Sequence, residues 1–290
     1  MLHTLDNGIL RVQISDKGAE LQSMQTADGH EYLWQGDARY WEDRAVNLFP
    51  TVGRLYNSRC TYEGKPYEIC LHGFAQHKQF QVTAGDMELV FTLTDDEETR
   101  KQYPFSFLYR VIYRLKKNRL EVCFEVENRG ENAMYFGLGG HPGFFVPMEE
   151  GVPFEEYHIR LPFAGETERI LFSAAGLTAG KVPYALQDRC IPLQHDLFDD
   201  DAIVLTNTNS CAIIERRGVE EGRRVTVEYP QMAYIGFWQA DHTDAPYVCI
   251  EPWQSLPGRD GVEESWEQRP AMIKLEPAER YSNDWAIALE

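Results

Sequence analysis

Alternation of apolar and polar residues with a period of two is the feature that most limits what this chain can fold into. In the segment LEVCFEVE at positions 120–127, one face is mainly charged and the other is apolar. This alternation is typical of a half-buried antiparallel strand. The same signal predicts further strands at Met87–Leu93, Phe107–Leu115, Ala202–Leu205, Arg224–Tyr229 and Met272–Leu275.

Helical periodicity is nearly absent from the sequence. One short helix is predicted after the acidic run at 95–98, and it should end before Pro104 because proline disfavours helix in the residue that precedes it. The residues KKNR at 116–119 indicate a hairpin connection. Many short strands separated by Gly, Pro, Asn and Asp predict a sandwich or barrel. No internal repeat or linker divides the chain, so residues 1–290 are expected to form a single domain.

Composition and charge exclude several classes of partner. The chain has 28 basic and 46 acidic residues and a formal net charge of −18. A field of that sign repels nucleic acid and anionic membranes, so neither is an expected partner. No apolar run is long enough to span a bilayer and no secretory signal is visible, so we expect a cytoplasmic protein. The six scattered cysteines form no CxxC pair and are expected to be reduced, buried thiols.

Two segments in the first third of the chain carry polar side chains in unusual settings. Arg54 ends the stretch NLFPTVGR and offers a fixed fork of donors to hydroxyls or carboxylates; a surface ion pair is the alternative. His72 precedes Gly73, which allows close backbone approach, and here the alternative is a hydrogen-bonded structural histidine. His77 follows five residues later, but two histidines without a nearby carboxylate do not make a metal site, so no metal is predicted.

Two later segments carry a histidine and a glutamate. His141 lies in GLGGHPGFF, where four glycines cost conformational entropy; we predict a tight loop that aims His141 into a cavity, or otherwise a structural turn. Glu251 ends the apolar run of a predicted buried strand, where desolvation raises a carboxyl pKa toward that of a general base, unless it faces water. Trp238, in YIGFWQ, either stacks on a sugar or belongs to the core.

Taken together, two histidines, one carboxylate and one arginine form a set suited to proton transfer. There is no GxSxG elbow, and no Ser or Cys stands out as a nucleophile. The sequence resembles the aldose 1-epimerase (mutarotase) family of the galactose mutarotase-like superfamily, particularly its bacterial branch associated with lactose and tagatose operons. The matching pieces are PTVGR at 50–54 with Asn57 and Arg59, LHG at 71–73, the His141 segment, and IEP at 250–252.

The resemblance implies an all-β fold, an antiparallel β-supersandwich with a sugar cleft on its concave face. It also implies that Glu251 is the base that removes the C1 hydroxyl proton and that His141 is the acid that protonates the ring oxygen. His72 and Arg54 would then bind the ring oxygen or hydroxyls. In the run of aspartates at 199–201, Asp201 is the expected hydroxyl ligand, with a solvated acidic turn as the alternative. Hemiacetal opening needs one proton removed and one proton added, so no cofactor is expected.

The predicted function is therefore that of an aldose 1-epimerase, an isomerase that interconverts the anomers of a free aldohexose such as galactose or glucose. One alternative is a hexose-6-phosphate mutarotase, with Arg54 and Arg59 serving the phosphate. Another is a non-catalytic carbohydrate-binding or sugar-sensing protein, which would not need both His141 and Glu251. A glycoside hydrolase normally needs two carboxylates, and only Glu251 has a suitable setting. The sequence leaves open which sugar is used, and whether the protein is a monomer or a homodimer.

Overall fold

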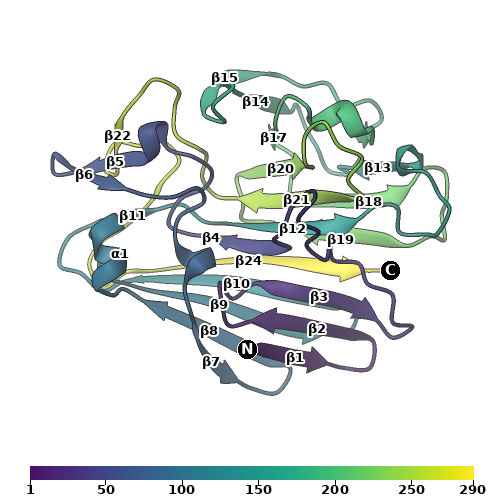
Figure 1. Ribbon diagram of the computed structural model, residues 1–290, viewed down its shortest axis with the longest axis horizontal. Helices are drawn as coiled ribbons and strands as arrows, with labels where there is room; N and C mark the ends of the chain where they lie inside the picture. Colours follow the sequence, from purple (N-terminus) through teal and green to yellow (C-terminus); the bar gives the residue numbers. More distant parts are fainter.

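Two large antiparallel sheets dominate the computed structural model, which describes residues 1–290 (Figure 1). The larger sheet contains, in spatial order, β16 (Cys190–Pro192), β13 (Tyr157–Arg160), β18 (Cys211–Arg216), β19 (Arg224–Glu228), β24 (Arg280–Leu289), β10 (Arg119–Asn128), β9 (Phe107–Lys116), β8 (Glu88–Thr94) and β7 (Gln81–Ala84). The second contains β15 (Thr178–Pro183), β14 (Glu168–Phe172), β17 (Ile203–Thr206), β20 (Tyr234–Trp238), β21 (Tyr247–Trp253), β12 (Gly139–Phe145) and β4 (Ala45–Leu48). The predicted all-β, antiparallel architecture is confirmed.

Smaller elements complete the fold. Three minor sheets comprise β1 (Leu2–Asp6), β2 (Leu10–Ser15) and β3 (Leu21–Thr26); β22 (Glu264–Ser265), β5 (Arg59–Tyr62) and β6 (Lys65–Glu68); and β11 (Met134–Phe136) with β23 (Ile273–Leu275). Helical turns are α1 (Glu97–Gln102) and the 3-10 turns η1 (Tyr56–Ser58), η2 (Ala75–His77), η3 (Phe154–Glu156) and η4 (His195–Phe198). None of these helices has the length and apolar character required to cross a membrane.

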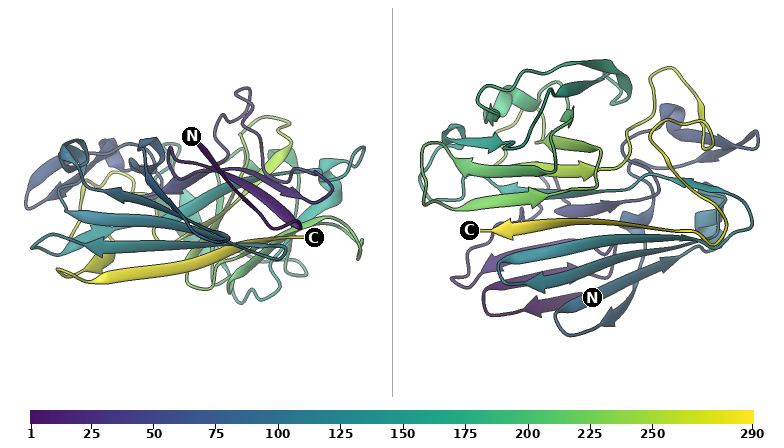
Figure 2. Two further views of the ribbon diagram at one scale, coloured as in Figure 1. Left: turned by 90° about the horizontal axis from the view of Figure 1, so that it is seen from below. Right: turned by 180° about the vertical axis from the view of Figure 1, so that it is seen from behind.

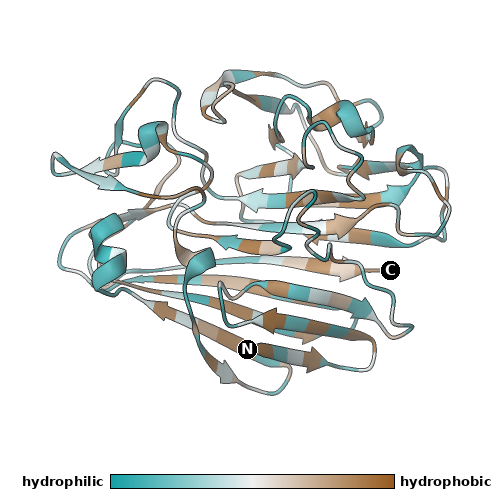
Figure 3. Cartoon of the chain, viewed as in Figure 1, coloured by the Kyte–Doolittle hydropathy of each residue, from teal (hydrophilic) through white to brown (hydrophobic).

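The hydrophobic core follows from the alternation read in the sequence. Along β10 the apolar positions are buried, while the glutamates are only partly covered. Apolar and polar bands alternate along many of the strands in Figure 3. One continuous cluster of 61 buried residues draws side chains from both large sheets and from the β1–β3 sheet. That small sheet lies across one face of the larger sheet (Figure 2), where β1 meets β8.

The predicted strands are confirmed with small shifts at their ends. The segment predicted at Met87–Leu93, for example, is β8, which begins at Glu88 because Met87 adopts a left-handed turn conformation with φ of 50°. The hairpin predicted at 116–119 joins β9 to β10. The six cysteines are free thiols. The prediction that all of them are buried is wrong for Cys70, which is exposed, and for Cys190, which is partly exposed.

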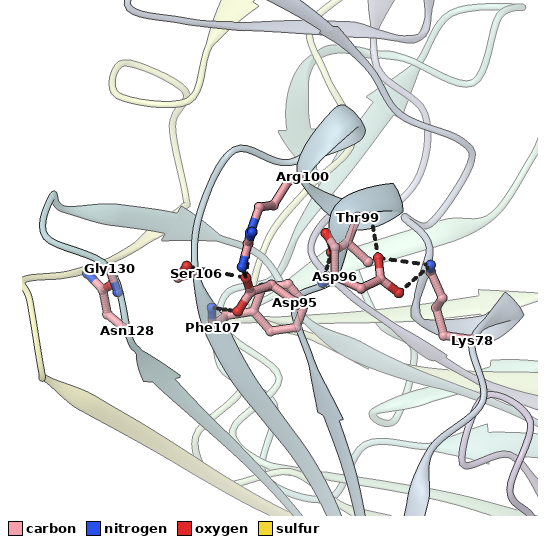
Figure 4. Close-up of polar contacts among 9 residues, drawn as sticks. All are labelled: Lys78, Asp95, Asp96, Thr99, Arg100, Ser106, Phe107, Asn128 and Gly130. Atoms are coloured by element: carbon pink, nitrogen blue, oxygen red, sulfur yellow. Dashed lines mark hydrogen bonds and ion pairs between the residues drawn. The ribbon is translucent and has the colours of Figure 1, made fainter.

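The predicted short helix is α1, and the side chains of Asp95 and Asp96 hold its first turn in place (Figure 4). The Asp96 carboxylate accepts a hydrogen bond from the Thr99 backbone N–H at 2.6 Å, and the Thr99 hydroxyl oxygen accepts one from the Asp96 N–H at 2.8 Å. These bonds satisfy N–H groups that a helix start otherwise leaves unpaired. Asp95 accepts from the Phe107 N–H at 3.0 Å and pairs with Arg100, so the helix is tied to the start of β9.

The glycine-rich segment around His141 is a strand, β12, so the prediction of a tight loop is wrong. None of its glycines has a positive φ. They are needed because neighbours approach closely. A Cβ atom added to Gly139 would lie 2.8 Å from the carbonyl oxygen of Pro252, and one added to Gly140 would lie 2.7 Å from the Trp285 ring. Steric exclusion, and not conformational freedom, therefore explains this glycine run.

We predict that Gly139→Ala lowers the free energy of unfolding by about 1–3 kcal/mol, because the new methyl group must displace a backbone carbonyl on β21. Urea denaturation followed by tryptophan fluorescence measures this change. Gly165→Ala is the matched control, since the nearest atom to its added Cβ lies 3.8 Å away. Equal stability of Gly139→Ala and the control would contradict the steric explanation.

Candidate active site

A cavity of about 280 Å³ opens over the seven-stranded sheet. The structure brings together at this cavity all six residues that the sequence pointed to: Arg54, His72, His141, Asp201, Trp238 and Glu251. They come from positions spread over about two hundred residues. Sheet order brings together His141, Trp238 and Glu251, because β20, β21 and β12 are successive neighbours. Arg54, His72 and Asp201 reach the cavity from segments between strands.

The cavity floor is set by strand register. Gly139 of β12 faces Trp253 of β21, and Gly143 faces Cys249, so His141 lies opposite Glu251. On the other side, His141 pairs with Val46 of β4. Side chains on neighbouring strands at the same register point to the same face. The sheet itself therefore holds the imidazole and the carboxyl side by side, without depending on a flexible loop.

His141 and Glu251 form a close and strongly desolvated pair. Nε2 of His141 lies 3.1 Å from Oε2 of Glu251, and their side chains are only 9% and 2% exposed. The contact lacks good hydrogen-bond geometry, and Nδ1 of His141 and Oε2 of Glu251 have no hydrogen-bond partner. Burial, assisted by the negative charge of Asp201, raises the pKa of Glu251 well above its ordinary value. Burial, assisted by His72, lowers the pKa of His141 well below its ordinary value.

His72 is locked in place by reciprocal hydrogen bonds with Gly53. The Gly53 N–H donates to Nδ1 of His72 at 3.1 Å, and the His72 N–H donates to the Gly53 carbonyl oxygen at 3.0 Å. Burial and the nearby charge of Arg54 lower the pKa of His72 to about 4. The neutral ring therefore carries its proton on Nε2, because Nδ1 is the acceptor. Its edge meets the face of His141, with ring centroids 5.4 Å apart at 89°.

Aromatic rings enclose His141 on two sides. The Trp41 ring lies 4.9 Å from the His141 ring at a tilt of 35°. The Trp238 ring meets His141 nearly edge-on at 5.7 Å. Trp238 is partly exposed and lines the cavity, so it is not simply a core residue. These rings exclude water from the pair and offer flat apolar faces to a ligand.

Sequence reasoning missed several residues that line the cavity: Trp41, Asp43, Gln76 and Phe172. None of them lies in a motif, and each reaches the cavity from a loop, a strand end or, for Gln76, the 3-10 turn η2. Asp43 is partly covered, and burial together with Glu42 raises its pKa. The only signal in the sequence was the presence of a large aromatic residue and a carboxylate two positions apart at 41 and 43.

The run of aspartates at 199–201 is divided by the fold. Only Asp201 lines this cavity, whereas Asp199 bonds to the backbone N–H of His242 at 2.7 Å. Asp201 has φ of 79°, and its carboxylate accepts from the Ala202 N–H at 2.7 Å. Arg59 does not line the cavity; it pairs with Glu68 at 2.9 Å. His77, which raised the idea of a metal site, also lies outside it.

A possible donor set for a metal ion does exist at the floor. His141, Cys249 and Glu251 offer ligand atoms that all lie within 4.8 Å of one another. Burial raises the pKa of the Cys249 thiol well above its ordinary value, so without a metal ion the protonated thiol is favoured over the thiolate that metals bind.

Comparisons with known proteins agree with this architecture. The family model described as aldose 1-epimerase matches residues 1–287. A galactose mutarotase related enzyme from Lactobacillus acidophilus has a similar structure, with a TM-score of 0.94 and 36% identity, covering 100% of this chain and 97% of that one. A galactose mutarotase-like protein from Lactobacillus casei also has a TM-score of 0.94, with 28% identity and 100% of both chains covered.

Among curated proteins, the chromosomal protein LacX of Lactococcus lactis subsp. lactis is 28% identical over 300 residues, covering 98% of each chain. The predicted galactose mutarotase-like fold is thus confirmed by structures that match the chain from end to end. The chain belongs to the aldose 1-epimerase family.

Proposed function

We propose that this protein is a mutarotase that interconverts the α and β anomers of a free aldohexose, with His141 and Glu251 moving the protons. The observation that carries this proposal is the 3.1 Å approach of His141 Nε2 to Glu251 Oε2 at the floor of the cavity. The two oxygens of a hemiacetal are bonded to the same carbon. An acid and a base that lie side by side can therefore reach both oxygens at once.

In the proposed reaction, Glu251 accepts the proton of the C1 hydroxyl while His141 donates a proton to the ring oxygen. The bond between C1 and the ring oxygen breaks, and a carbonyl forms at C1. Rotation about the C1–C2 bond presents the other face of the aldehyde. Ring closure then runs the two proton transfers in reverse, so both groups return to their starting states.

The opposed pKa shifts suit this exchange. Burial stabilises the neutral state, with the carboxyl protonated and the imidazole neutral, over the ion pair. The two states differ only in which partner holds one shared proton, so a change that favours the charged forms moves that proton from Glu251 to His141. Sugar hydroxyls that enter the cavity solvate the charged form, as hydrogen bonds to a charged group favour that form. Substrate binding would thereby prepare the acid and the base.

The remaining side chains have supporting roles in this proposal. The Nε2 proton of neutral His72 and the Arg54 guanidinium are donors for the ring oxygen or hydroxyls. Asp201 is an acceptor for hydroxyls, and Trp238 packs on the sugar ring. Because the lining residues run from position 41 to 257, we propose that residues 1–290 act as one domain.

The charges around the cavity favour a free sugar over a hexose 6-phosphate. Asp43, Asp201 and Glu251 line it together with a single guanidinium, that of Arg54. A phosphate dianion would meet more carboxyl groups than cations. Arg59, the second arginine considered for a phosphate, is paired with Glu68 and lies outside the cavity.

We predict that the wild-type protein speeds the decay of optical rotation of freshly dissolved α-glucose or α-galactose. His141→Ala and Glu251→Ala should each lower kcat/KM at least about a hundredfold, which is the usual contribution of a positioned acid or base. Polarimetry at constant temperature measures the rate above the spontaneous one.

The matched controls are His77→Ala and Glu263→Ala, two exposed residues that do not line the cavity. Both should retain wild-type activity, and urea denaturation should show that all four variants fold. A wild-type protein that binds sugars but never exceeds the spontaneous rate would instead establish a non-catalytic sugar-binding protein.

We predict a bell-shaped pH profile of kcat/KM. On the acid side activity ends when a second proton binds the pair at His141, whose lowered pKa places this limb well below pH 6.5. On the alkaline side activity ends when the last proton leaves Glu251. Asp201→Asn should move the alkaline limb to lower pH, because removing the Asp201 charge makes ionised Glu251 less unfavourable. Asp196→Asn, an exposed control outside the cavity, should leave both limbs at their wild-type pH. If Asp201→Asn does not move the alkaline limb, Glu251 is not the group that titrates there.

A further inference from the structure

Cys249 is a buried thiol beside the reacting pair that the proposed reaction does not use. It lies two positions before Glu251 on β21, so both side chains project from the same face of the sheet. Across the strand pair Cys249 faces Gly143 of β12, and its Sγ lies 3.3 Å from the position that a Cβ atom on Gly143 would take. The ligand atoms of His141, Cys249 and Glu251 all lie within 4.8 Å of one another. An imidazole, a thiol and a carboxyl group thus surround one small space.

The spacing of these three groups is close to that of a metal coordination sphere. Bonds of about 2.0–2.3 Å to a zinc ion place the ligand atoms of a tetrahedral site roughly 3.3–3.7 Å apart. Nε2 of His141 and Oε2 of Glu251 lie 3.1 Å apart. Because no two of the three ligand atoms are more than 4.8 Å apart, movements of about 1 Å bring them all to metal-bonding distance. Rotation about the Cα–Cβ bond of Cys249 supplies a movement of that size.

Two atoms of this group lack the hydrogen bonds that buried polar atoms normally make. They are Nδ1 of His141 and Oε2 of Glu251, on side chains that are only 9% and 2% exposed. A buried polar atom without a partner is costly, and an ion or a water molecule commonly fills that role. A cation between His141 and Glu251 supplies the partner that the carboxyl oxygen lacks.

The cavity provides a route to the three residues and room for a further ligand. His141 and Glu251 line it, so a cation from solvent reaches these two first. Cys249 does not line it; the partly exposed Trp41 ring lines the cavity and packs against the cluster that contains the thiol. A volume of about 280 Å³ leaves room for a water molecule as fourth ligand. Three protein ligands and one open position are typical of zinc sites that a substrate can reach.

The charges around the cavity attract a cation. Asp43, Asp201 and Glu251 line it, and Arg54 is the single guanidinium among the lining residues. The net charge of −18 of the whole chain adds to this surplus of negative charge. The same field that disfavours a phosphate therefore raises the local concentration of a divalent cation.

The donor atoms determine which cations fit. Mg²⁺ and Ca²⁺ take oxygen ligands, whereas a set of sulfur, nitrogen and oxygen suits Zn²⁺ and related ions. Binding displaces the thiol proton of Cys249 and the one proton shared by His141 and Glu251, so two protons leave to solvent. The bound cation then supplies the positive charge that stabilises the thiolate and the carboxylate in a buried setting.

We propose that His141, Cys249 and Glu251 form an inhibitory site for a thiophilic divalent cation of the Zn²⁺ type. The bound ion occupies the imidazole nitrogen and the carboxylate that proton transfer needs, and it lies where C1 of the sugar would react. The inhibition rests on the function proposed above for His141 and Glu251; the binding of the metal ion does not.

Cobalt(II) absorption tests the metal site without relying on catalysis. Tetrahedral Co²⁺ absorbs in the visible range, and a bond between cobalt and a thiolate adds a charge-transfer band in the near ultraviolet. We expect both signals to grow in the reduced wild-type protein until one equivalent of Co²⁺ is bound, and Zn²⁺ to remove them by displacement. An excess of Mg²⁺ should leave them unchanged.

Variants then locate the ligands. Cys249→Ser should abolish the charge-transfer band, and Glu251→Gln, which keeps the side-chain volume, should lower the affinity for Co²⁺ at least about tenfold. The matched control carries both Cys70→Ser and Cys190→Ser, because these are the two cysteines that are not buried. It should retain the wild-type spectrum, and this result assigns the band to a buried thiol even if Cys249→Ser does not fold.

Polarimetry measures the effect of the metal on activity. Saturating Zn²⁺ should lower the mutarotation rate of the wild-type protein about a hundredfold, the usual contribution of a positioned acid or base, and a chelator should restore the rate. Half-inhibition of Cys249→Ser should need at least about ten times more Zn²⁺. Each rate is corrected for the spontaneous reaction at the same Zn²⁺ concentration.

The outcomes separate this inference from the proposed function. A wild-type protein without the charge-transfer band, or a band that persists in folded Cys249→Ser, would overturn the metal site even if the protein is an active mutarotase. Full mutarotase activity with the metal ion bound would overturn the inhibitory role. Binding of one Co²⁺ through Cys249 in a protein that never accelerates mutarotation would retain the metal site and reject the mutarotase.

Discussion

Oε2 of Glu251 and Nε2 of His141 are held 3.1 Å apart, and both side chains are almost fully buried. Much of the surrounding structure keeps these two side chains in place. Removing a carboxyl and an imidazole from water penalises their charged forms, which is why their pKa values shift in opposite directions. Such a placement is stable only if the backbone leaves the two groups no alternative position. The pairing of β12 with β21 supplies that constraint, since both residues lie inside strands of a seven-stranded sheet.

The same constraint accounts for unusual backbone near the cavity. Glycines 139 and 140 allow Pro252 and Trp285 to pack within a distance that a side chain would prevent. His72 has φ of 61° and Asp201 has φ of 79°, conformations that cost energy for residues other than glycine. His72 is held there by its two hydrogen bonds to Gly53.

Four of the nine strands of the larger sheet, β8, β9, β10 and β19, could be predicted because their signal is local. Along β10 the apolar residues are buried and the charged ones are only partly covered, with the buried Asn128 as the exception. The helix start at Asp96 is visible in four residues. The His141 segment was assigned wrongly for the opposite reason. Its glycines are explained by Pro252 and Trp285, more than a hundred positions away in the chain, and composition cannot reveal such contacts. Trp41 and Asp43 were missed because their role depends only on where the loop before β4 lies.

The sequence by itself determined the all-β class, the positions of several strands, and a small set of titratable and aromatic residues in unusual settings. It did so because period-two burial and the cost of a polar group in an apolar run are properties of neighbouring residues. Only the tertiary structure decided which of those residues meet. Register between β12 and β21 places His141 beside Glu251. Asp201, in the turn before β17, lines the same cavity, whereas Asp199, two positions earlier, bonds to His242. Proximity between distant segments arises from sheet order, which no single segment encodes.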